Sequence, residues 1–595
     1  MRKKRLVSII GLILGMMFFA SSCSSKGDSG TGNAGNSGGV VSQSGVNLIN
    51  GVGTYDQETT YLVGKNPDSL PQTAKSRKDT LVVGFVAPNG VFNPLLQESA
   101  SDADVNDAMW SPLLEIGYDG QVIEGIAELP EVSEDGKKYT FKIKDGVKWQ
   151  DGTPITSEDI EFTFKVIMDK TFIGRFEREN LDIVGWKDYR DGKTDKISGF
   201  EIIDERTFSI TLNDSNAKSL NYFVIPPLAK HIYGGENGYV QGDAKSLEKF
   251  NRTPFGNGPY KFVSYKDGEE VTLVANENFY KGKPSIENLI FRSVNETNQL
   301  LLLQNGDIDV IRRNMTVTDE NLHLLDQLGF ANATITENLG YGYIAINFGE
   351  ELLKDKNVRK ALAYGLDRKS VVGAIFGDQA NVIDIPQSTV SWSYPDNEDF
   401  VKYDFDPEKA KQLLEDAGWK VGSDGIRVKD GVKLSLKFLA SAPNPVNDSL
   451  VPIMIENYKD IGIELKAEQM EFRTLIDKQT EARDGKFNYH LAFLAWELTP
   501  DPDPSSVFGT QGSSNKIKYS NQKADDLMSR ALREFDLEKR KSLYGELYKE
   551  LSDDLPYIFL YQRKNMDVFL SRVKGMEGVT PYRTFIKDLE KIRLE

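Results

Sequence analysis

Cysteine and histidine are almost missing from this chain of 595 residues, which contains one Cys and three His. Cys23 has no partner for an intrachain disulfide, and His231, His323 and His490 lie far apart in the sequence. Zinc and haem sites need such ligands at short spacings. We therefore predict no disulfide framework, no metal and no cofactor, and expect large hydrophobic cores to stabilise the fold.

Basic residues are fewer than acidic ones. The chain has 72 Lys and Arg against 89 Asp and Glu, a formal net charge of -17 at pH 7. Recognition of nucleic acid depends on Lys and Arg that neutralise phosphates. The acidic balance argues against nucleic acid as a partner and against a basic face that binds a membrane.

One apolar run is present, and it lies near the start of the chain. Residues 6–20 are mostly apolar and follow four basic residues at positions 2–5. A helix needs about 20 apolar residues to cross a bilayer, so residues 1–22 are predicted to be an export signal. Residues 20–23 (ASSC) resemble the lipobox of bacterial lipoproteins, which implies a diacylglyceryl group on Cys23. The alternative is an ordinary signal-peptidase site with a free cysteine.

A Gly- and Ser-rich segment follows the cysteine. Residues 24–45 contain seven Gly and six Ser, and such composition is typical of a flexible tether. We predict a lipidated, tethered segment over residues 23–78. The roughly 515 residues after it exceed what one hydrophobic core usually organises, so at least two lobes are expected.

Strand and helix patterns alternate along the remaining chain. Tyr139, Phe141 and Ile143 alternate with polar residues, which predicts a half-exposed strand. Thr156 and Asp159 then form a capping-box pattern ahead of an apolar helical stripe. The local signals indicate a strand, a turn and a helix in succession.

The same mixture recurs further along. Asp406 followed by Pro407 predicts a helix start, and Gly418 predicts its end. Two more helices are expected around residues 358–362 and 371–376, and alternating apolar residues at 434–438 predict a strand. The fold class is α/β, with no evident internal repeat.

Several motifs occur in a specific order. They are residues 92–96 (FNPLL), 139–152 (YTFKIKDGVKWQDG), 258–262 (GPYKF), 306–309 (GDID), 357–365 (NVRKALAYG), 367–368 (DR), 406–419 (DPEKAKQLLEDAGW), 496–504 (WELTPDPDP) and 555–556 (LP). Together they resemble the peptide and nickel family of extracytoplasmic solute-binding proteins, over nearly everything from residue 80 to 595.

The resemblance implies a two-lobed fold of the type II periplasmic-binding kind. Lobe I would comprise residues 79–339 plus 562–595 and lobe II residues 340–561, joined by two crossing strands. A short peptide would bind between lobes that close by hinge motion. The resemblance further implies a monomeric, non-enzymatic, lipid-anchored subunit outside the cytoplasmic membrane, which delivers its solute to the permease and ATPase subunits of an ABC importer.

The resemblance also carries over candidate ligand-binding residues. A peptide enclosed in a cleft needs main-chain partners, since each unpaired buried polar group costs roughly 1–3 kcal/mol. The carried-over candidates are Glu98, Ser99, Ala100, Arg312, Arg313, Asn314, Asn338, Gly340, Tyr341, Tyr343, Ala495, Trp496 and Glu497.

Arg312 and Arg313 depart from the family pattern, which has Tyr and Asn there. Two guanidiniums facing the cleft would hold a peptide carboxylate or an acidic side chain. The alternative for both is that they point to solvent or form structural ion pairs. For Tyr341 and Tyr343 the alternative is packing at the hinge.

The family's ammonium site is altered in this chain. In the family an Asp soon after the Trp binds the peptide's ammonium group, but here Thr499 or Pro500 falls at that place. Asp501 and Asp503 are the candidates for that role.

A receptor for short peptides is the function that we predict. Left open are a receptor of the same fold for a nickel chelate or an oligosaccharide, and a receptor for a peptide signal. An exported hydrolase is disfavoured, because no nucleophile with a base and no paired carboxylates occur in a credible context.

Overall fold

The computed structural model describes residues 40–41, 47–50 and 59–595, apart from residues 98, 175, 177–180, 215 and 236–237. The predicted signal peptide (residues 1–22), Cys23 and the first part of the predicted tether, residues 24–39, lie outside the described residues. The predictions made for them are therefore not tested by the structure.

The folded part begins before residue 78, where the predicted tether ended. β3 (Thr59–Val63) pairs antiparallel with β15 (Ala331–Glu337) and buries Tyr61 and Leu62 on its two faces. α1 (Gln72–Ser76) follows and buries Ala74. The prediction of a tether was wrong for these residues, because composition averaged over a long window hides a short strand with few apolar side chains.

Local patterns predicted several elements correctly. β8 (Lys138–Lys142) buries Tyr139 and Phe141, and α3 (Ser157–Ile167) begins with the capping box of Thr156 and Asp159. α3 then buries the predicted apolar stripe against the core.

Helix ends were predicted equally well elsewhere. The Asp406 carboxylate accepts a hydrogen bond from the N–H of Lys409, Pro407 starts α11 (Pro407–Asp416), and Gly418 follows the helix with φ +86°. Asp367 caps α10 (Arg368–Phe376), which follows α9 (Lys356–Tyr364). These helix starts follow from side chains that accept the free N–H groups of a first turn.

Among the described residues, 15 strands form one continuous hydrogen-bonded sheet. Ten of them lie in the order β1-β2-β3-β15-β24-β14-β4-β13-β12-β11, and five attach through β24 and β16. Their bounds, besides β3 and β15, are β1 (Val40–Val41), β2 (Asn47–Asn50), β4 (Thr80–Phe85), β11 (Tyr260–Lys266), β12 (Glu270–Ala275), β13 (Asn288–Ser293), β14 (Val310–Arg312), β16 (Tyr341–Ile346), β17 (Ala380–Val382), β21 (Ser435–Ser441), β22 (Glu464–Met470), β23 (Leu491–Trp496) and β24 (Tyr557–Leu570).

The remaining elements surround this sheet. Shorter sheets contain β5 (Leu114–Ile116), β6 (Val122–Glu124), β7 (Glu131–Val132), β9 (Phe200–Ile202), β10 (Thr207–Thr211), β18 (Lys420–Val421), β19 (Arg427–Lys429), β20 (Val432–Lys433), β25 (Val573–Lys574) and β26 (Arg593–Leu594). The other helices are α2 (Ala100–Met109), α5 (Trp186–Arg190), α6 (Lys230–Tyr233), α7 (Gln299–Asn305), α8 (Asp319–Leu328), α12 (Pro445–Asp460), α13 (Phe472–Arg483), α14 (Ser505–Phe508), α15 (Gln522–Arg533), α16 (Leu537–Asp554) and the 3₁₀ turns η1 (Ser219–Phe223), η2 (Ala244–Phe250), η3 (Glu351–Leu353) and η4 (Phe585–Lys591).

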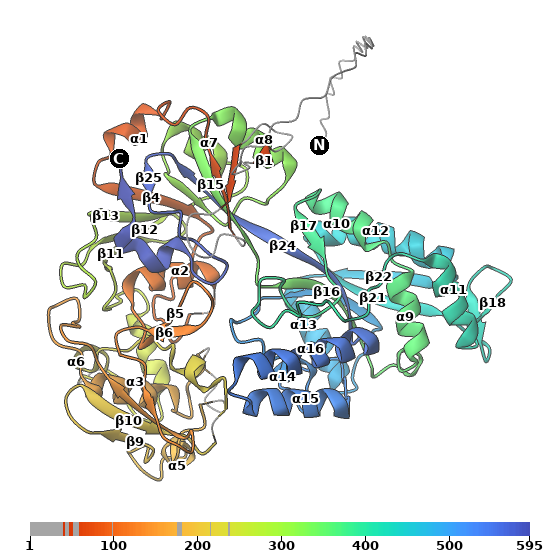
Figure 1. Ribbon diagram of the computed structural model, residues 1–595, viewed down its shortest axis with the longest axis horizontal. Helices are drawn as coiled ribbons and strands as arrows, with labels where there is room; N and C mark the ends of the chain where they lie inside the picture. Colours follow the sequence, from red (N-terminus) through yellow and green to blue (C-terminus); the bar gives the residue numbers. More distant parts are fainter. Residues whose placement is uncertain are drawn as a thin grey trace, which may run out of the picture. The chain divides into compact units, whose positions relative to one another are not determined.

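β24 connects two groups of strands. Its first part, Tyr557–Arg563, pairs with β16 and β17, and its second part, Lys564–Leu570, pairs with β15 and β14. In Figure 1 this strand, in dark blue, runs from the neighbourhood of β15 to that of β16. One strand therefore belongs to both groups.

The buried hydrophobic residues divide in the same way. Two clusters draw their members from residues 61–335 and 566–592, and two others draw theirs from residues 341–561. The divisions fall between residues 335 and 341 and between residues 561 and 566. Both lie where β24 passes from one group of strands to the other.

Candidate functional site

Several predicted site residues meet where β24 passes between the two groups of strands. Asn338, in the segment from β15 to β16, donates from its amide to Glu497 Oε2 at 3.4 Å and to Asn565 Oδ1 at 3.3 Å. Its own Oδ1 accepts from the N–H of Gly340 at 2.6 Å. A Cβ on Gly340 would lie 2.1 Å from the carbonyl oxygen of Trp496, so this contact requires glycine.

The end of β23 offers a free backbone edge. One side of β23 pairs with β16, with Trp496 opposite Tyr341 and Ala495 opposite Gly342. On the other side, β21 pairs only with Leu491 and Ala492. No strand of the described chain covers that edge at residues 493–496, and Ala495 and Glu497 are exposed.

Tyr341 and Tyr343 do not offer a ring to a ligand. Their exposed fractions are 4% and 3%. The Tyr343 ring stacks on Tyr557 with centroids 4.0 Å apart, and Tyr341 packs on Phe559 at 5.8 Å. Tyr341 and Tyr343 are two residues apart on β16, so their side chains point to the same face of the sheet, and both are buried there. Packing in the core therefore replaces the predicted contact of these rings with a ligand.

Arg312 is not a free cation either. It donates two hydrogen bonds to Asp104 at 3.0 and 3.2 Å and two to Asp567 at 3.1 Å. Its side chain is 4% exposed. Burial alone would lower the pKa of Arg312, but the two carboxylates raise it above the usual value. Its predicted contact with a ligand is therefore replaced by structural ion pairs.

The guanidinium of Arg313, unlike that of Arg312, is exposed and unpaired among the described residues. The backbone of Arg313 is left-handed (φ +46°), and its N–H donates to Asp567 Oδ1 at 3.0 Å. The side chain is exposed, and no residue in the described part of the chain bonds to its guanidinium. Desolvation by surrounding protein, with the charge of Arg312, lowers the pKa of Arg313. It is an unpaired cation at the protein surface.

Three further candidates are engaged in local structure. The Asn314 side-chain amide donates to Gln299 Oε1 at 2.9 Å, and the Gln299 amide donates to the backbone carbonyl of Asn314 at 2.9 Å. Ser99 caps α2, and its carbonyl accepts from the N–H of Ala103, so Ser99 and Ala100 begin a helix rather than an extended edge. Glu98 lies outside the described residues.

Both candidates for an ammonium site are already paired. Asp501 lies 2.8 Å from a guanidinium nitrogen of Arg540, and Asp503 lies 3.1 Å from the ammonium of Lys218. Lys218 and Arg540 were missed from the sequence, because nothing local marks a cation that pairs with a carboxylate 285 or 39 residues away.

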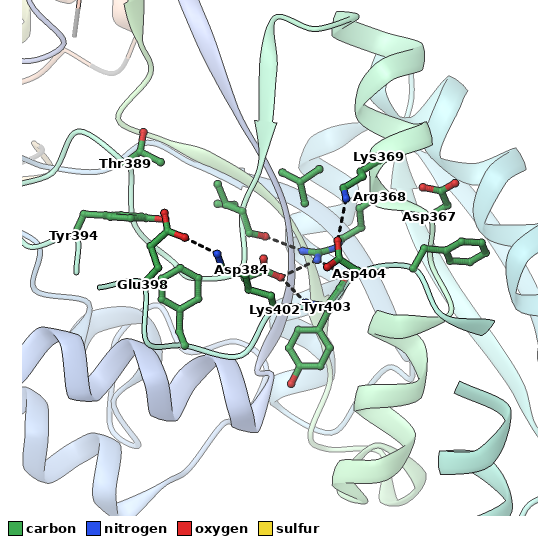
Figure 2. A pocket seen from close by; sticks show the side chains of 14 residues that line it. Asp367, Arg368, Lys369, Asp384, Thr389, Tyr394, Glu398, Lys402, Tyr403 and Asp404 are labelled. Atoms are coloured by element: carbon green, nitrogen blue, oxygen red, sulfur yellow. Dashed lines mark hydrogen bonds and ion pairs between the residues drawn. The ribbon is translucent and has the colours of Figure 1, made fainter. Parts of the chain in front are cut away.

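A separate cavity of about 280 Å³ lies among residues 367–405. Figure 2 shows that each of its cations pairs with a carboxylate of the same wall. The pairs are Arg368 with Asp384, Lys369 with Asp404, and Lys402 with Glu398. These cations are neutralised within the wall, so this cavity is a weaker candidate for a charged solute than the unpaired guanidinium of Arg313.

No group of three or more His, Cys, Asp or Glu side chains among the described residues is arranged to hold a metal ion. No helix within the described ranges has the length and apolar character needed to cross a membrane.

Comparisons with known proteins cover most of the chain. The sequence profile of "Bacterial extracellular solute-binding proteins, family 5 Middle" matches residues 121–519. The oligopeptide-binding protein AppA of Bacillus subtilis is 30% identical over 506 residues, which is 84% of this chain and 88% of that protein. Heme-binding protein A of Haemophilus influenzae is 27% identical over 532 residues, 86% of this chain and 92% of that protein.

A solved structure has the same fold. The structure of Bacillus subtilis AppA in complex with a nonapeptide superposes with a TM-score of 0.71 at 28% identity, and the match covers 87% of this chain and 99% of that one. The predicted α/β fold with two lobes is thereby confirmed.

Proposed function

Because the chain belongs to family 5 of the bacterial extracellular solute-binding proteins, we propose that it captures short peptides outside the membrane as the substrate-binding subunit of an ABC importer. The relatives support a peptide: AppA of Bacillus subtilis is an oligopeptide-binding protein, and its solved structure holds a nonapeptide.

The free edge of β23 is the observation that carries this proposal. An extended peptide placed along residues 493–496 would add a strand to the sheet and satisfy its own N–H and C=O groups. Each such group left unpaired would cost roughly 1–3 kcal/mol. Of the predicted ligand contacts, Ala495, Trp496, Glu497, Asn338, Gly340 and Arg313 are retained in this proposal.

Arg313 supplies the charge in this arrangement. Its unpaired guanidinium suits a carboxylate, either the peptide's carboxyl terminus or an acidic side chain, because Arg forms bidentate pairs with carboxylates. Glu497 acts electrostatically on it, so the solute's anionic group would approach from the side away from Glu497.

The lobes are proposed to be residues 79–339 plus 562–595, extended by the folded residues from 59, and residues 340–561. The division of the hydrophobic clusters supports these boundaries. Closure of the lobes around a peptide would be the signal that a permease detects.

The anchor and partners are also proposals. The export signal at residues 1–22 and the lipobox-like residues 20–23 support a diacylglyceryl anchor at Cys23. The protein would act as a monomer, perform no catalysis, and deliver its peptide to permease and ATPase subunits.

Native mass spectrometry of the full-length chain, purified without denaturation, tests the proposal. Peptides released from the protein would establish peptide binding. An empty protein whose melting temperature no peptide pool raises would refute it, since a ligand of the native state must stabilise that state. Haem, nickel–histidine and oligosaccharides belong in the same screen; the similarity to heme-binding protein A favours haem as the second candidate.

A further inference from the structure

The two carboxylates that follow β23 are neutralised by the chain itself. Asp501 accepts from the Arg540 guanidinium at 2.8 and 3.0 Å, with side chains 4% and 5% exposed. Asp503, whose side chain is 6% exposed, pairs with Lys218 at 3.1 Å. The two pairs adjoin, because the N–H of Asp503 donates to Asp501 Oδ1 at 3.1 Å.

Each carboxylate oxygen in this network already accepts a hydrogen bond. Asp503 Oδ1 accepts from the backbone N–H and the hydroxyl of Ser505, and Asp503 Oδ2 accepts from Lys218. Asp501 uses both oxygens for Arg540. An incoming ammonium group would have to share these oxygens with the donors already in place.

The position of Lys218 is fixed by its backbone. Its N–H donates to Asn216 Oδ1 at 3.0 Å, and the N–H of Ala217 donates to the carbonyl of Leu532 at 2.8 Å. Burial would lower the pKa of Lys218, but Asp503, Tyr222 and Asp501 together outweigh burial and raise it. The ammonium at Asp503 is therefore charged and held in place from both segments.

The other carboxylates nearby offer no better site. Lys218 and Asp503 line a cavity of about 630 Å³ together with Asp182, Asp214 and Asp525. The two oxygens of Asp525 accept from the N–H and hydroxyl of Thr510, and Asp182 accepts from indole and amide groups. Asp214 is exposed, where water screens its charge.

From these contacts we infer that Lys218 determines specificity: its ammonium occupies the carboxylate of Asp503, so the site binds peptides with an uncharged amino terminus as well as those with a free amino group. This inference rests on the proposed function, because it names the kind of peptide that the same site takes. A buried ammonium needs a free carboxylate to offset its desolvation, and the chain has filled both that follow β23.

Glu497 is the one acidic candidate left at this end of β23. It is exposed, it is hydrogen bonded by Asn338, and no cation of the described chain forms an ion pair with it. An ammonium held there would restore the requirement for a free amino group, so Glu497→Gln belongs in the test.

The test compares two forms of the same peptides. Pools from dipeptides to nonapeptides are prepared with free and with acetylated amino termini, and their dissociation constants are measured by competition in native mass spectrometry. The acetylated and free forms should differ in the wild-type chain by less than about fivefold, the range of an exposed charge contact.

Lys218→Met should create the missing discrimination. It frees the Asp503 carboxylate, so the free form should bind about tenfold or more tightly than the acetylated form, as expected for a charge-assisted hydrogen bond. If Lys218→Met also weakens the contact between the two proposed lobes, it should weaken binding of the free and the acetylated peptides equally. That effect cancels in the ratio of their dissociation constants. The double variant Lys218→Met with Asp503→Asn removes both charges and should return the ratio to the wild-type range. Lys230→Met, which breaks an exposed pair with Glu158, is the matched control and should keep the wild-type ratio.

The outcomes are distinct. A wild-type preference above about tenfold for the free form overturns the inference, and its loss in Glu497→Gln would place the ammonium at Glu497. An unchanged ratio in Lys218→Met also overturns it. If neither form of any pool binds, the proposed function fails, and this inference fails with it.

Discussion

Replacing Arg312 with Met should lower the free energy of unfolding by about 3–5 kcal/mol, the cost of breaking a buried ion pair from one side. Arg312 makes four hydrogen bonds of 3.0–3.2 Å to Asp104 and Asp567. Without it, the Asp567 carboxylate, 4% exposed, keeps its charge and loses its cation. Met replaces the aliphatic stem of Arg312 but not its guanidinium, so most of the loss would come from the carboxylates left without a cation.

The adjacent arginine provides the matched control. Arg313→Met should change the free energy of unfolding by no more than about 0.5 kcal/mol, because its guanidinium has no partner in the described chain. The same substitution should weaken binding of a peptide with a carboxylate by about 1.5–3 kcal/mol, the range of a charged hydrogen bond. Stability and affinity are thus expected to separate between two neighbouring residues.

Urea unfolding followed by tryptophan fluorescence, without ligand, measures the first effect, and isothermal titration calorimetry measures the second. If Arg312→Met keeps the wild-type urea midpoint, or if Arg313→Met lowers it as far, the assignment of the ion pairs is refuted. Unchanged affinity in Arg313→Met would remove Arg313 from the proposed ligand contacts.

Three further predictions concern pH and packing. Burial lowers the pKa of His490 to about 4, so the stability that neutral His490 contributes is fully present above the unfolded pKa of 6.5 and is lost as pH falls towards 4. His490→Asn should therefore lose about 3 kcal/mol less free energy of unfolding than the wild type between neutral pH and pH 4. Equal losses of urea midpoint in both proteins would contradict this. Burial would raise the pKa of Asp588, but Arg583 lowers it to about 2, so the stability that the carboxylate contributes is present above pH 3.8 and is lost as pH falls to about 2. Asp588→Asn should lower the free energy of unfolding by about 2.5 kcal/mol at neutral pH and make stability depend less on pH in acid. An acid transition as steep as that of the wild type would count against this. Gly340→Ala should destabilise the protein by about 1–3 kcal/mol through a steric clash. Gly373→Ala, in a helix with open space around it, should stabilise the protein by about 0.5–1 kcal/mol. Melting temperatures measure both effects, and shifts of the same sign in the two variants would refute the comparison.

Sequence alone predicted features whose cause is local. The Thr156–Asp159 capping box and the Asp406 cap lie at the predicted positions, because a helix end is decided by side chains within one turn. Alternating strand residues such as Tyr139 and Phe141 were predicted for the same reason. The same local patterns indicated the α/β class, and the resemblance added the two lobes; the structural match confirms both.

The site was predicted less well because its charges are paired over long distances in sequence. Arg312 and Arg313 are adjacent and of one type, yet only the structure shows that Arg312 lies between two carboxylates. From the sequence, Asp503 was predicted to be available for the peptide's ammonium group, but the structure shows it in an ion pair with Lys218. Which charges are free depends on contacts between segments that no local pattern marks.

The shared strand β24 has a consequence for how the protein is made. Each group of strands lacks an internal member until residues 557–570 have been synthesised, because β14, β15, β16 and β17 all pair with β24. Closing such long loops is entropically costly, and folding that depends on distant pairing is slow. Neither part of the sheet can therefore be completed until nearly the whole polypeptide has been synthesised.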